Sequence, residues 1–578
     1  MSQPSQQAPQ TGLLTGRAKN LALAGLFLAN FVSMLAMNVV GTSMPIIIAD
    51  IGGTQAAFTW VVTATMLASA ISTPIWGKLA DLTSKKVLLQ VALIVFILAS
   101  AFAGFAQDPT WLIACRVFQG IGVGGLGALA QIVLAEIISP LERGKYMGIL
   151  GAIMAVATVG GPLLGGLLTD TVGWRWNFYV AAPIAIVAII MLQRTLHLPT
   201  RKQKVKIDYW GTALISLGFS SLLIWVTLAG SNFDWWSWQT AAMVGGGLVA
   251  LVIAVFVELK VEEPLIPMTL FTNRTFTLAS IASIAVGLAM MGTAVFLGQY
   301  MQLARGRSVI ESSLLTLPMM AGVLLSSTIV GQIITRTGKW KRYMVAGAVA
   351  LLAGLVMMGQ LRYDTTYWYV GVSMAVLGAG VGMTMQNLVL VVQNTVNPAE
   401  MGTSTSAVTF FRTIGGTAGI SVMGAILAHE VADYFKEGFT KLGALMQQNP
   451  DPAVIADLQK FQESNAIPKI ADLSAPVREV VESSYGHAIG NIFLAAAPVA
   501  IVALIAIIFL PNIPLSNKSN AERISELSQR EKAAPSDAGS TAGAELFGDA
   551  VRVATGSIPV ITSEGGGRDG DDGPSTAR

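Results

Sequence analysis

Two arginines lie inside long apolar stretches of this 578-residue chain, and they are the residues best suited to ion or substrate chemistry. A guanidinium at the centre of a bilayer costs about 2.5–3.5 kcal/mol on insertion scales, so each must face partners inside the protein. Arg116 has Gln119 three residues later on the same helical face. This pair suits proton transfer or substrate contact, with a structural hydrogen-bond hub as the alternative. Both roles are equally open for Arg412.

A second group of charges surrounds a short polar loop at residues 77–86, which has a related copy 254 residues later at 331–339. Asp81 follows an apolar stretch, where it can meet cations or the N-terminus of a neighbouring helix. Glu136 ends another apolar stretch and can pair with a lysine of the loop. These charges predict a conformational latch; the alternative is a solvated cluster, worth about 0–1 kcal/mol per exposed pair. The latch residues are Gly77, Asp81, Lys85, Lys86 and Glu136.

Two further segments repeat at nearly the same spacing and in the same order. The glycines at 120, 122 and 124 return 258 residues later, and Thr-Val-Gly-Gly at 158–161 returns as Thr-Ile-Gly-Gly 255 residues later. Three matching pieces predict a duplicated bundle with parallel halves and a binding site between them.

Composition places the chain in a membrane. Hydrophobic residues make up 53% of it, charged residues only 12%, and the mean hydropathy is +0.63. A bilayer core takes about 20 apolar residues per crossing. Cys115 is the single cysteine, so no disulfide framework is possible, and His197, His429 and His487 give no metal site. No nucleotide-binding loop or catalytic constellation is present, so we expect neither an enzyme nor a nucleic-acid partner.

Hydropathy predicts an all-α polytopic protein with fourteen transmembrane helices. Lysines and arginines fix the orientation: eighteen lie in the inner segments before Met344, against four in the short outer loops. Both termini are therefore expected in the cytoplasm. The predicted spans are 21–45, 57–77, 87–106, 110–135, 146–168, 177–193, 209–230, 238–257, 276–303, 312–335, 343–361, 367–393, 404–428 and 488–510.

The repeat spacing exceeds six helices, so two helices are predicted to be inserted between two six-helix halves. An extracellular segment at 429–487 has apolar residues at helical spacing, which indicates an amphipathic helix on the membrane or protein; a spacer is the alternative. The predicted parts are a disordered N-terminus (1–20), the first half (21–196), the insertion (197–260), the second half (261–510) and a disordered cytoplasmic tail (511–578).

These segments resemble the major facilitator superfamily. Residues 77–86 are similar to its inner-loop motif Gly-x-Leu-Ala-Asp-x-x-Gly-Arg-Lys, with Ser84 and Lys85 replacing the second glycine and the arginine. Residues 116–120 are similar to its fourth-helix motif Arg-x-x-Gln-Gly. Segments at 174–178, 208–211 and 410–412 resemble the fourteen-helix drug:proton antiporters. The resemblance implies the major facilitator fold, a place in the plasma membrane (the bacterial inner membrane), and a proton gradient rather than a cofactor as the energy source.

A glycine-rich segment resembles the fifth-helix antiporter motif of this branch. Small residues about one turn apart let helices approach closely in lipid, and a proline removes a backbone donor. Tight packing alone is one interpretation; a bend that closes the cavity against ion leakage is the other. The residues are Gly160, Gly161, Pro162, Gly165 and Gly166.

The chain departs from this branch at the usual proton site. Ala36 stands where the first helix usually carries an aspartate, and Thr65 replaces a common tyrosine. Proton coupling then requires a carboxylate nearer a helix end or a proton carried by the substrate, or it is absent. The candidate carboxylates are Asp50, Glu136, Asp170 and Glu311.

The predicted substrate cavity combines methionine, aromatic and amide side chains on facing helices. Such a lining suits amphipathic, uncharged or weakly cationic organic molecules, and helix packing is the alternative role for each residue. The candidates are Met34, Asn38, Thr42, Phe296, Gln299, Tyr300, Gln386 and Asn387.

Together these features predict a monomeric secondary active transporter in the lipid bilayer. It would export lipophilic or amphipathic small molecules by alternating access, in exchange for protons. The first alternative is an uncoupled facilitator or a nutrient uptake carrier. The second is a membrane sensor or assembly factor that does not transport.

Overall fold

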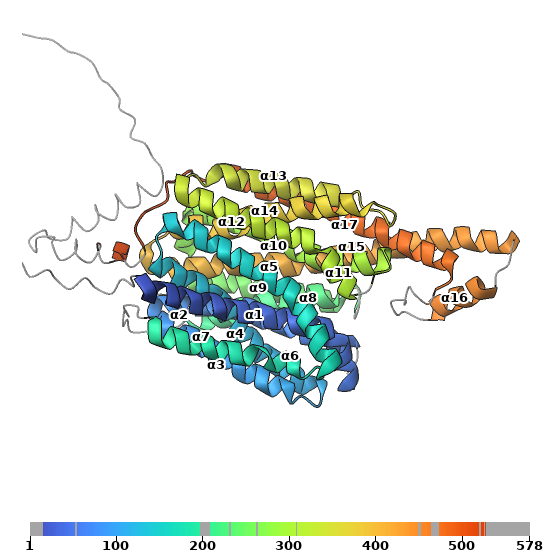
Figure 1. Cartoon of the computed structure of the whole chain (residues 1–578), viewed down its shortest axis with the longest axis horizontal. Helices are drawn as coiled ribbons and strands as arrows, with labels where there is room; N and C mark the ends of the chain where they lie inside the picture. Colours follow the sequence, from blue (N-terminus) through green and yellow to red (C-terminus); the bar gives the residue numbers. More distant parts are fainter. Residues whose placement is uncertain are drawn as a thin grey trace, which may run out of the picture. The chain divides into compact units, whose positions relative to one another are not determined.

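The structure is a computed structural model in which nearly every described residue is helical (Figure 1). It describes residues 16–52, 55–196, 208–229, 233–261, 264–307, 309–448, 452–463, 473–519, 522–524 and 526. Within these ranges the β structure is limited to one isolated bridge, between Ala229 and Phe233. Backbone groups in a bilayer need partners within the protein, and helices satisfy this within one segment.

Six spans form each half of the bundle. The first half contains α1 (Gly16–Asp50), α2 (Gln55–Leu82), α3 (Lys85–Gly104), α4 (Pro109–Ile137), α5 (Pro140–Thr171) and the pair α6 (Trp176–Tyr179) and α7 (Ala181–Thr195). The second contains α10 (Arg274–Gln299), α12 (Leu317–Thr337), α13 (Lys341–Met358), α14 (Tyr367–Thr395), α15 (Met401–Gln448) and α17 (Ala475–Phe509). Short helices η1 (Met268–Thr272), η2 (Tyr300–Ala304), α11 (Val309–Leu315) and η3 (Pro398–Glu400) lie between these spans.

The two halves pack in the same way. In the first half α4 lies against α2 and α3, and α1 lies against α5 and α7. In the second half α14 lies against α12 and α13, and α10 lies against α15 and α17. Each half also has its own core of buried apolar residues. The matching contacts show the duplicated, two-half architecture that the repeated segments predict.

Twelve stretches of the described helices are long and apolar enough to cross a membrane, judged by length and composition. They include every main helix of the two halves except α2, and also α9 (Trp238–Glu258) of the insertion. In the other inserted helix, α8 (Tyr209–Leu228), the apolar stretch counted is the shorter segment Trp210–Trp225. With α2 and α8 added, the set corresponds to the fourteen predicted spans, and the count of fourteen remains a prediction.

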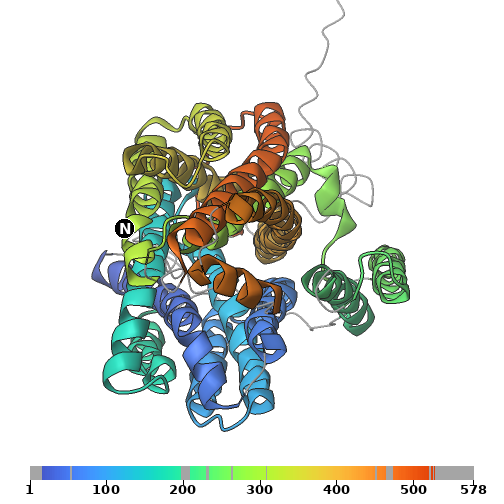
Figure 2. The same ribbon diagram turned by 90° about the vertical axis from the view of Figure 1, so that its right-hand side faces the viewer.

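The inserted helices α8 and α9 pack mainly against each other. Figure 2 shows them as a pair beside the bundle, and α8 also contacts α2 and α15. Asp208 lies directly before α8. Its carboxylate accepts a hydrogen bond from the backbone N–H of Gly211 (2.8 Å) and so caps the helix. Glu258, the last residue of α9, is buried and accepts a hydrogen bond from Ile266 N–H (3.3 Å).

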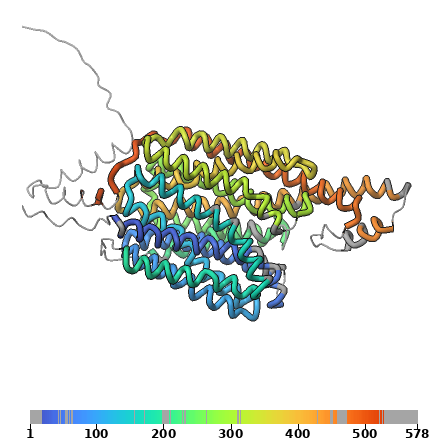
Figure 3. The backbone as a smooth tube through the Cα atoms, in the orientation of Figure 1, coloured from blue at the N-terminus to red at the C-terminus, as the bar shows by residue number. Residues whose placement is uncertain are grey.

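The predicted outer segment 429–487 is mostly a continuation of the flanking spans. Helix α15 runs unbroken to Gln448, α16 (Pro452–Glu463) follows, and α17 already begins at Ala475 (Figure 3). The apolar face of the α15 extension, which includes Phe435 and Leu442, packs against Val477 and Val481 of α17. The interpretation as a mere spacer is wrong for these residues, because they form a small apolar core.

Candidate functional site: contacts between the halves at one end of the bundle

The halves meet closely at one end of the bundle, called here the closed end. Helices α2, α4, α12 and α14 finish there, and α5 and α15 begin there. At this end Asp81 of α2 reaches the first turn of α15. Its carboxylate accepts hydrogen bonds from Gly402 N–H (2.7 Å), Thr403 N–H (2.7 Å) and the Thr403 hydroxyl (2.8 Å).

These three bonds are favourable for two physical reasons. The first N–H groups of a helix have no intrahelical acceptor, and Asp81 supplies acceptors for two of them. The helix dipole also places partial positive charge at the same point, which stabilises a carboxylate. Of the two partners expected for Asp81, the structure therefore shows the helix N-terminus.

A close backbone approach accompanies the Asp81 contact. Gly77, one turn before Asp81, faces α15 so tightly that a Cβ atom there would overlap Ser406 and the carbonyl oxygen of Gly402. Gly402 in turn faces the carbonyl oxygen of Gly77. Glycine at both positions lets the α2 backbone come near enough for the short side chain of Asp81 to reach the helix end.

The second half repeats this contact with a neutral residue. Thr335 of α12 lies 254 positions after Asp81, and its hydroxyl accepts a hydrogen bond from Lys145 N–H (3.0 Å) in the first two turns of α5. Gly331, the copy of Gly77, packs so closely on Gly144 that a Cβ at either position would overlap the other's carbonyl oxygen. Both repeated loops thus close the same end of the bundle.

The predicted ion pair of the loop is formed with Lys85. Lys85 Nζ lies 3.5 Å from Glu136 Oε2, and the Glu136 side chain is only 4% exposed. Lys86 instead donates to the carbonyl oxygen of Gln193 (2.7 Å) at the end of α7. The pair is therefore buried rather than a solvated surface cluster, and removing one partner would leave a charge without solvent.

The sequence interpretation missed a buried hub built on Arg143. Its guanidinium donates to the side chain of Gln393 in α14 (2.5 Å) and to the carbonyl oxygens of Ala135 (3.0 Å) and Ile138 (2.9 Å). Gln393 also donates to the Thr405 hydroxyl of α15 (3.0 Å). Arg143 thus links α4 and α5 to the second half. In the sequence it counts only as one of many inner-loop positive charges, so no pattern distinguishes it.

Arg116 and Gln119 form the pair that their spacing predicts. Arg116 Nη1 donates to Gln119 Oε1 (2.7 Å), and the Gln119 amide donates to the Ser100 hydroxyl of α3 (2.8 Å). All three side chains are buried. Arg116 Nε has no hydrogen-bond partner among the described residues, which leaves one strong donor for an added group.

Arg412 has fewer contacts than Arg116. It is buried in α15 against Gly287 of α10, and its Nη1 has no hydrogen-bond partner in the described part of the chain. Gln386 in α14 is also buried, and its Oε1 is likewise unpartnered within those residues. A buried donor or acceptor without a partner is costly, so these two, like Arg116, are the predicted site residues suited to contact with a bound group.

Asp50 lies at the opposite end of the bundle from the latch. Its carboxylate accepts a hydrogen bond from Trp174 Nε1 (2.8 Å) and lies 3.4 Å from Arg175 Nη1. Its side chain is 51% exposed, so water can exchange protons with it directly. The Asp170 side chain falls outside the described residues, and Glu311 is exposed at the start of α11.

The glycines of the antiporter-type motif fall on two faces of α5. Gly161 faces α1, where a Cβ would overlap Asn38, and the carbonyl oxygen of Gly165 accepts a bond from Ser43 (3.2 Å). A Cβ at Gly160 or Gly166 would meet nothing within 4 Å. Close helix packing therefore accounts for two of the four glycines of the motif, Gly161 and Gly165. Pro162 lies inside an otherwise continuous helix.

The predicted cavity residues are not all free to meet a ligand. Asn38 and Asn387 donate to carbonyl oxygens one turn earlier in their own helices, at Met34 (2.8 Å) and Met383 (2.7 Å). Tyr300 is fully buried, and its hydroxyl donates to the carbonyl oxygen of Arg362 (2.7 Å).

That bond ties Tyr300 to a loop between α13 and α14, which argues against a place on a ligand surface. Phe296 is buried and Gln299 partly buried, whereas the Thr42 side chain lies outside the described residues. A hollow of about 250 Å³ lies between α10 and α17, and its lining contains none of these candidates.

Two matching helical halves that meet through repeated loops are the architecture typical of a membrane transporter. A family model described as Major Facilitator Superfamily matches residues 26–420. The chain belongs to this superfamily, whose members are transporters and not enzymes.

Similar proteins carry names of the same kind. The chain is 32% identical over 550 residues to the "Multidrug transporter protein MdtP" of Bacillus subtilis, covering 92% of this chain and 98% of the relative. It is 29% identical to "Multidrug resistance protein 3" of the same organism, covering 83% and 93%. The crystal structure of the human organic anion transporter MFSD10 (TETRAN) shares the fold, with a TM-score of 0.51, 12% identity, and coverage of 86% and 100%.

Proposed function

We propose that this protein is a secondary active exporter of lipophilic or amphipathic small molecules, working by alternating access in exchange for protons. It lies in the plasma membrane with both termini in the cytoplasm, so the closed end faces the cytoplasm. The observation that carries the proposal is the pair of repeated loop contacts, at Asp81 and Thr335, that close one end of two matching halves. The relatives named for multidrug transport support the substrate class.

The residues suggest how the cycle is divided. Asp81, the Lys85–Glu136 pair and the tight glycines hold the cytoplasmic side closed while substrate leaves on the outside. Arg116 and Arg412 supply buried positive charge and unpartnered donors within the membrane. These donors fit the acceptor atoms of a substrate, or a carboxylate that changes its protonation state during the cycle.

The uncoupled facilitator remains the second candidate because of one observation. Ala36 occupies the position at which the fourteen-helix antiporters usually carry an aspartate, and it is buried among apolar neighbours. An alanine cannot bind a proton. Coupling in this chain would therefore use another carboxylate, such as Asp50 or Glu136, or a proton carried by the substrate, and without either the protein is an uncoupled carrier.

Dye movement in inverted membrane vesicles tests both candidates. The lipophilic dye Hoechst 33342 would be added to vesicles with an imposed pH gradient, and the same vesicles would be measured after nigericin collapses it. The parent is compared with Arg116→Ala, Arg116→Lys and Glu136→Gln. Arg342→Ala is the matched control, because that arginine is exposed and its hydrogen bond among the described residues goes to the neighbouring Tyr343 hydroxyl.

We expect gradient-dependent uptake that Arg116→Ala nearly abolishes and that Arg342→Ala leaves intact. Glu136→Gln should lower it, because Lys85 then lacks its partner. Uptake that continues unchanged without the gradient would show an uncoupled carrier. Normal uptake by Arg116→Ala would remove that residue from the mechanism.

A further inference from the structure

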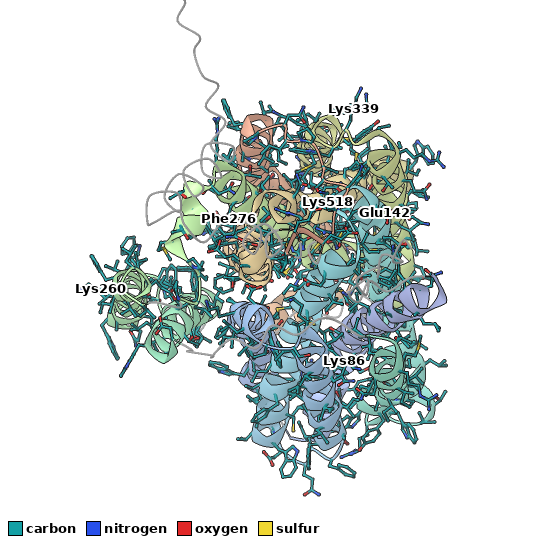
Figure 4. All side chains as sticks on the ribbon, turned by 90° about the vertical axis from the view of Figure 1, so that its left-hand side faces the viewer. Lys86, Glu142, Lys260, Phe276, Lys339 and Lys518 are labelled. Carbon is teal, nitrogen blue, oxygen red and sulfur yellow. The ribbon has the colours of Figure 1, made fainter. Side chains whose placement is uncertain are left out.

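The chain that follows the last helix crosses the closed end of the bundle. Residues 511–519, called here the strap, lie in the predicted disordered tail, yet they make defined hydrogen bonds to both halves. The prediction that disorder begins at residue 511 is therefore wrong for the strap. Figure 4 views this end, with Lys518 of the strap near the centre and Glu142 of α5 close to it.

Asn394, in the last turn of α14, fixes the strap to the second half. Its amide nitrogen donates to the carbonyl oxygen of Pro514 (3.1 Å), and its amide oxygen accepts from Ser516 N–H (2.9 Å). The Asn394 side chain is buried and both bonds are partly buried, which limits the access of water to them. One asparagine thus holds the strap backbone at two points, as a neighbouring β-strand would.

Two further bonds hold the strap and the chain just after it on the same half. Trp340, which is buried at the start of α13, donates from its indole nitrogen to the carbonyl oxygen of Ile513 (2.9 Å). Arg523 donates to the carbonyl oxygen of Val396 (3.3 Å), next to the end of α14. A cation is favourable at this helix end because of the helix dipole.

The strap also reaches the first half. The carbonyl oxygen of Ser516 accepts a hydrogen bond from Leu141 N–H (3.1 Å). Leu141 is the second residue of α5, so its N–H has no acceptor within the helix. Ser516 therefore uses its N–H for the second half and its carbonyl oxygen for the first.

This bridge adds to the weaker of the two repeated contacts. The backbone N–H groups at the start of α15 receive the charged side chain of Asp81, whereas the two backbone N–H groups of α5 that bond the second half meet neutral acceptors. These acceptors are the hydroxyl of Thr335 and the carbonyl oxygen of Ser516.

We propose that the strap is a third closure of the cytoplasmic side, which must detach from α5 each time that side opens, and that Asn394 is the residue that positions it. The inference rests on the proposed alternating-access cycle. Because the strap stays bound to the second half through Asn394, Trp340 and Arg523, only the bond to Leu141 has to break and form again in each cycle.

Covalent linkage of the strap to α5 tests this requirement. The full chain with Cys115→Ala, which removes its single cysteine, would carry Leu141→Cys and Ser516→Cys. A short bifunctional maleimide joins the two thiols in reconstituted vesicles. The matched control carries Thr395→Cys and Pro514→Cys, which join the strap to its own half beside Asn394 without removing that residue.

We expect transport of Hoechst 33342 before linkage in both proteins. Linkage should reduce it more than tenfold in the 141/516 pair and less than twofold in the 395/514 pair. Normal transport by the linked 141/516 protein would overturn the strap proposal while leaving the exporter proposal intact. Equal loss in both pairs would also overturn it, because immobilising the strap on its own half should not block opening. Absence of transport in the unlinked parent would contradict the exporter proposal itself.

A second measurement separates a positioning role from a general loss of stability. Ser327 is buried where α12 meets Gly148 and Gly151 of α5, so Ser327→Cys reports opening of the closed end. Asn394→Ala should raise its labelling by a membrane-impermeant maleimide from the cytoplasmic side at least threefold. Asn397→Ala is the control, because Asn397 caps only Ala399 (3.1 Å) and should leave labelling unchanged. Equal labelling in the parent and in Asn394→Ala would contradict the role of Asn394.

Discussion

Asp81 and Thr335 occupy equivalent places in the two halves, and they hold the facing helix in different ways. The carboxylate of Asp81 makes three hydrogen bonds at the N-terminus of α15. The hydroxyl of Thr335 accepts one from α5. Hydrogen bonds to a charged group are worth about 1.5–3 kcal/mol, against about 0.5–1.5 kcal/mol for a neutral one. The closed end therefore has one strong and one weak contact, although the close glycine packing is the same on both sides.

This difference teaches that duplication preserves geometry more strictly than charge. The glycines at 77 and 331 are both retained, because a Cβ at either would overlap a facing carbonyl oxygen. The hydrogen-bond acceptor four residues after each glycine, Asp81 or Thr335, can differ, provided that its side chain still reaches the first turns of the facing helix. In the proposed cycle, an unequal pair would let one contact release before the other when the closed end opens.

The largest effect is expected from Asp81→Asn. The amide keeps the shape but loses the charge and offers only one acceptor atom to a helix end that supplies three donors. Loss of about 1.5–3 kcal/mol lowers the closed population about 10- to 100-fold. Export measured as dye uptake in inverted vesicles should fall at least tenfold. Export near the parent rate would show that the Asp81 contact does not govern the cycle.

Gly331→Ala tests whether the close packing matters as much on the weak side. The added methyl group would overlap the carbonyl oxygen of Gly144, and such overpacking costs about 1–3 kcal/mol. Export should fall about tenfold, with increased labelling of Ser327→Cys from the cytoplasmic side. Gly245→Ala is the control, because a Cβ there meets nothing within 4 Å. Equal effects of the two alanines would contradict the importance of this approach.

Thr335→Val isolates the weak contact itself. Valine has nearly the shape of threonine. It removes the acceptor for Lys145 N–H, the contact between the halves, together with the bond that the hydroxyl donates to the Gly331 carbonyl oxygen within α12. Loss of one neutral hydrogen bond predicts a two- to tenfold decrease in export, since the bond is worth about 0.5–1.5 kcal/mol. The comparison between the halves would fail if Thr335→Val impaired export as strongly as Asp81→Asn.

The smallest effect is expected from moving the charge. Thr335→Asp in the Asp81→Asn background places a carboxylate at the start of α5, where the helix dipole is worth about 0.3–1 kcal/mol. Export should recover about two- to fivefold relative to Asp81→Asn alone, measured in the same vesicles. A further loss would mean that the two contacts are not interchangeable.

The sequence predicted one side of each contact but not its partner. The repeated loop identified Gly77 and Asp81, because a polar loop between apolar stretches stands out locally. The acceptor role of Asp81 toward Gly402 joins residues 321 positions apart, and no periodicity reports such a pairing. The sequence predicted the amide of Gln119 beside Arg116, because residues three positions apart on a helix share a face.

Other residues could not be recognised, for reasons that are equally physical. Arg143 stands among inner-loop cations that topology alone explains, and only burial against Gln393 reveals its role as a hub. Tyr300 shares a helical face with Phe296, yet the bond of its hydroxyl to Arg362 ties it to a loop. The strap has no apolar periodicity, since its order comes from backbone bonds to Asn394 and Leu141.

The sequence by itself determined the class of protein: apolar stretches long enough for a bilayer, a duplicated bundle, and polar loops between the spans. The distribution of charge among those loops predicts the orientation. These properties are local, because the bilayer requires each span separately to bury its backbone and to exclude charge. Only the tertiary structure decided which helix end each loop holds, which charges are buried together, and where the strap lies. Those contacts join distant parts of the chain, and they exist only because the two halves pack face to face.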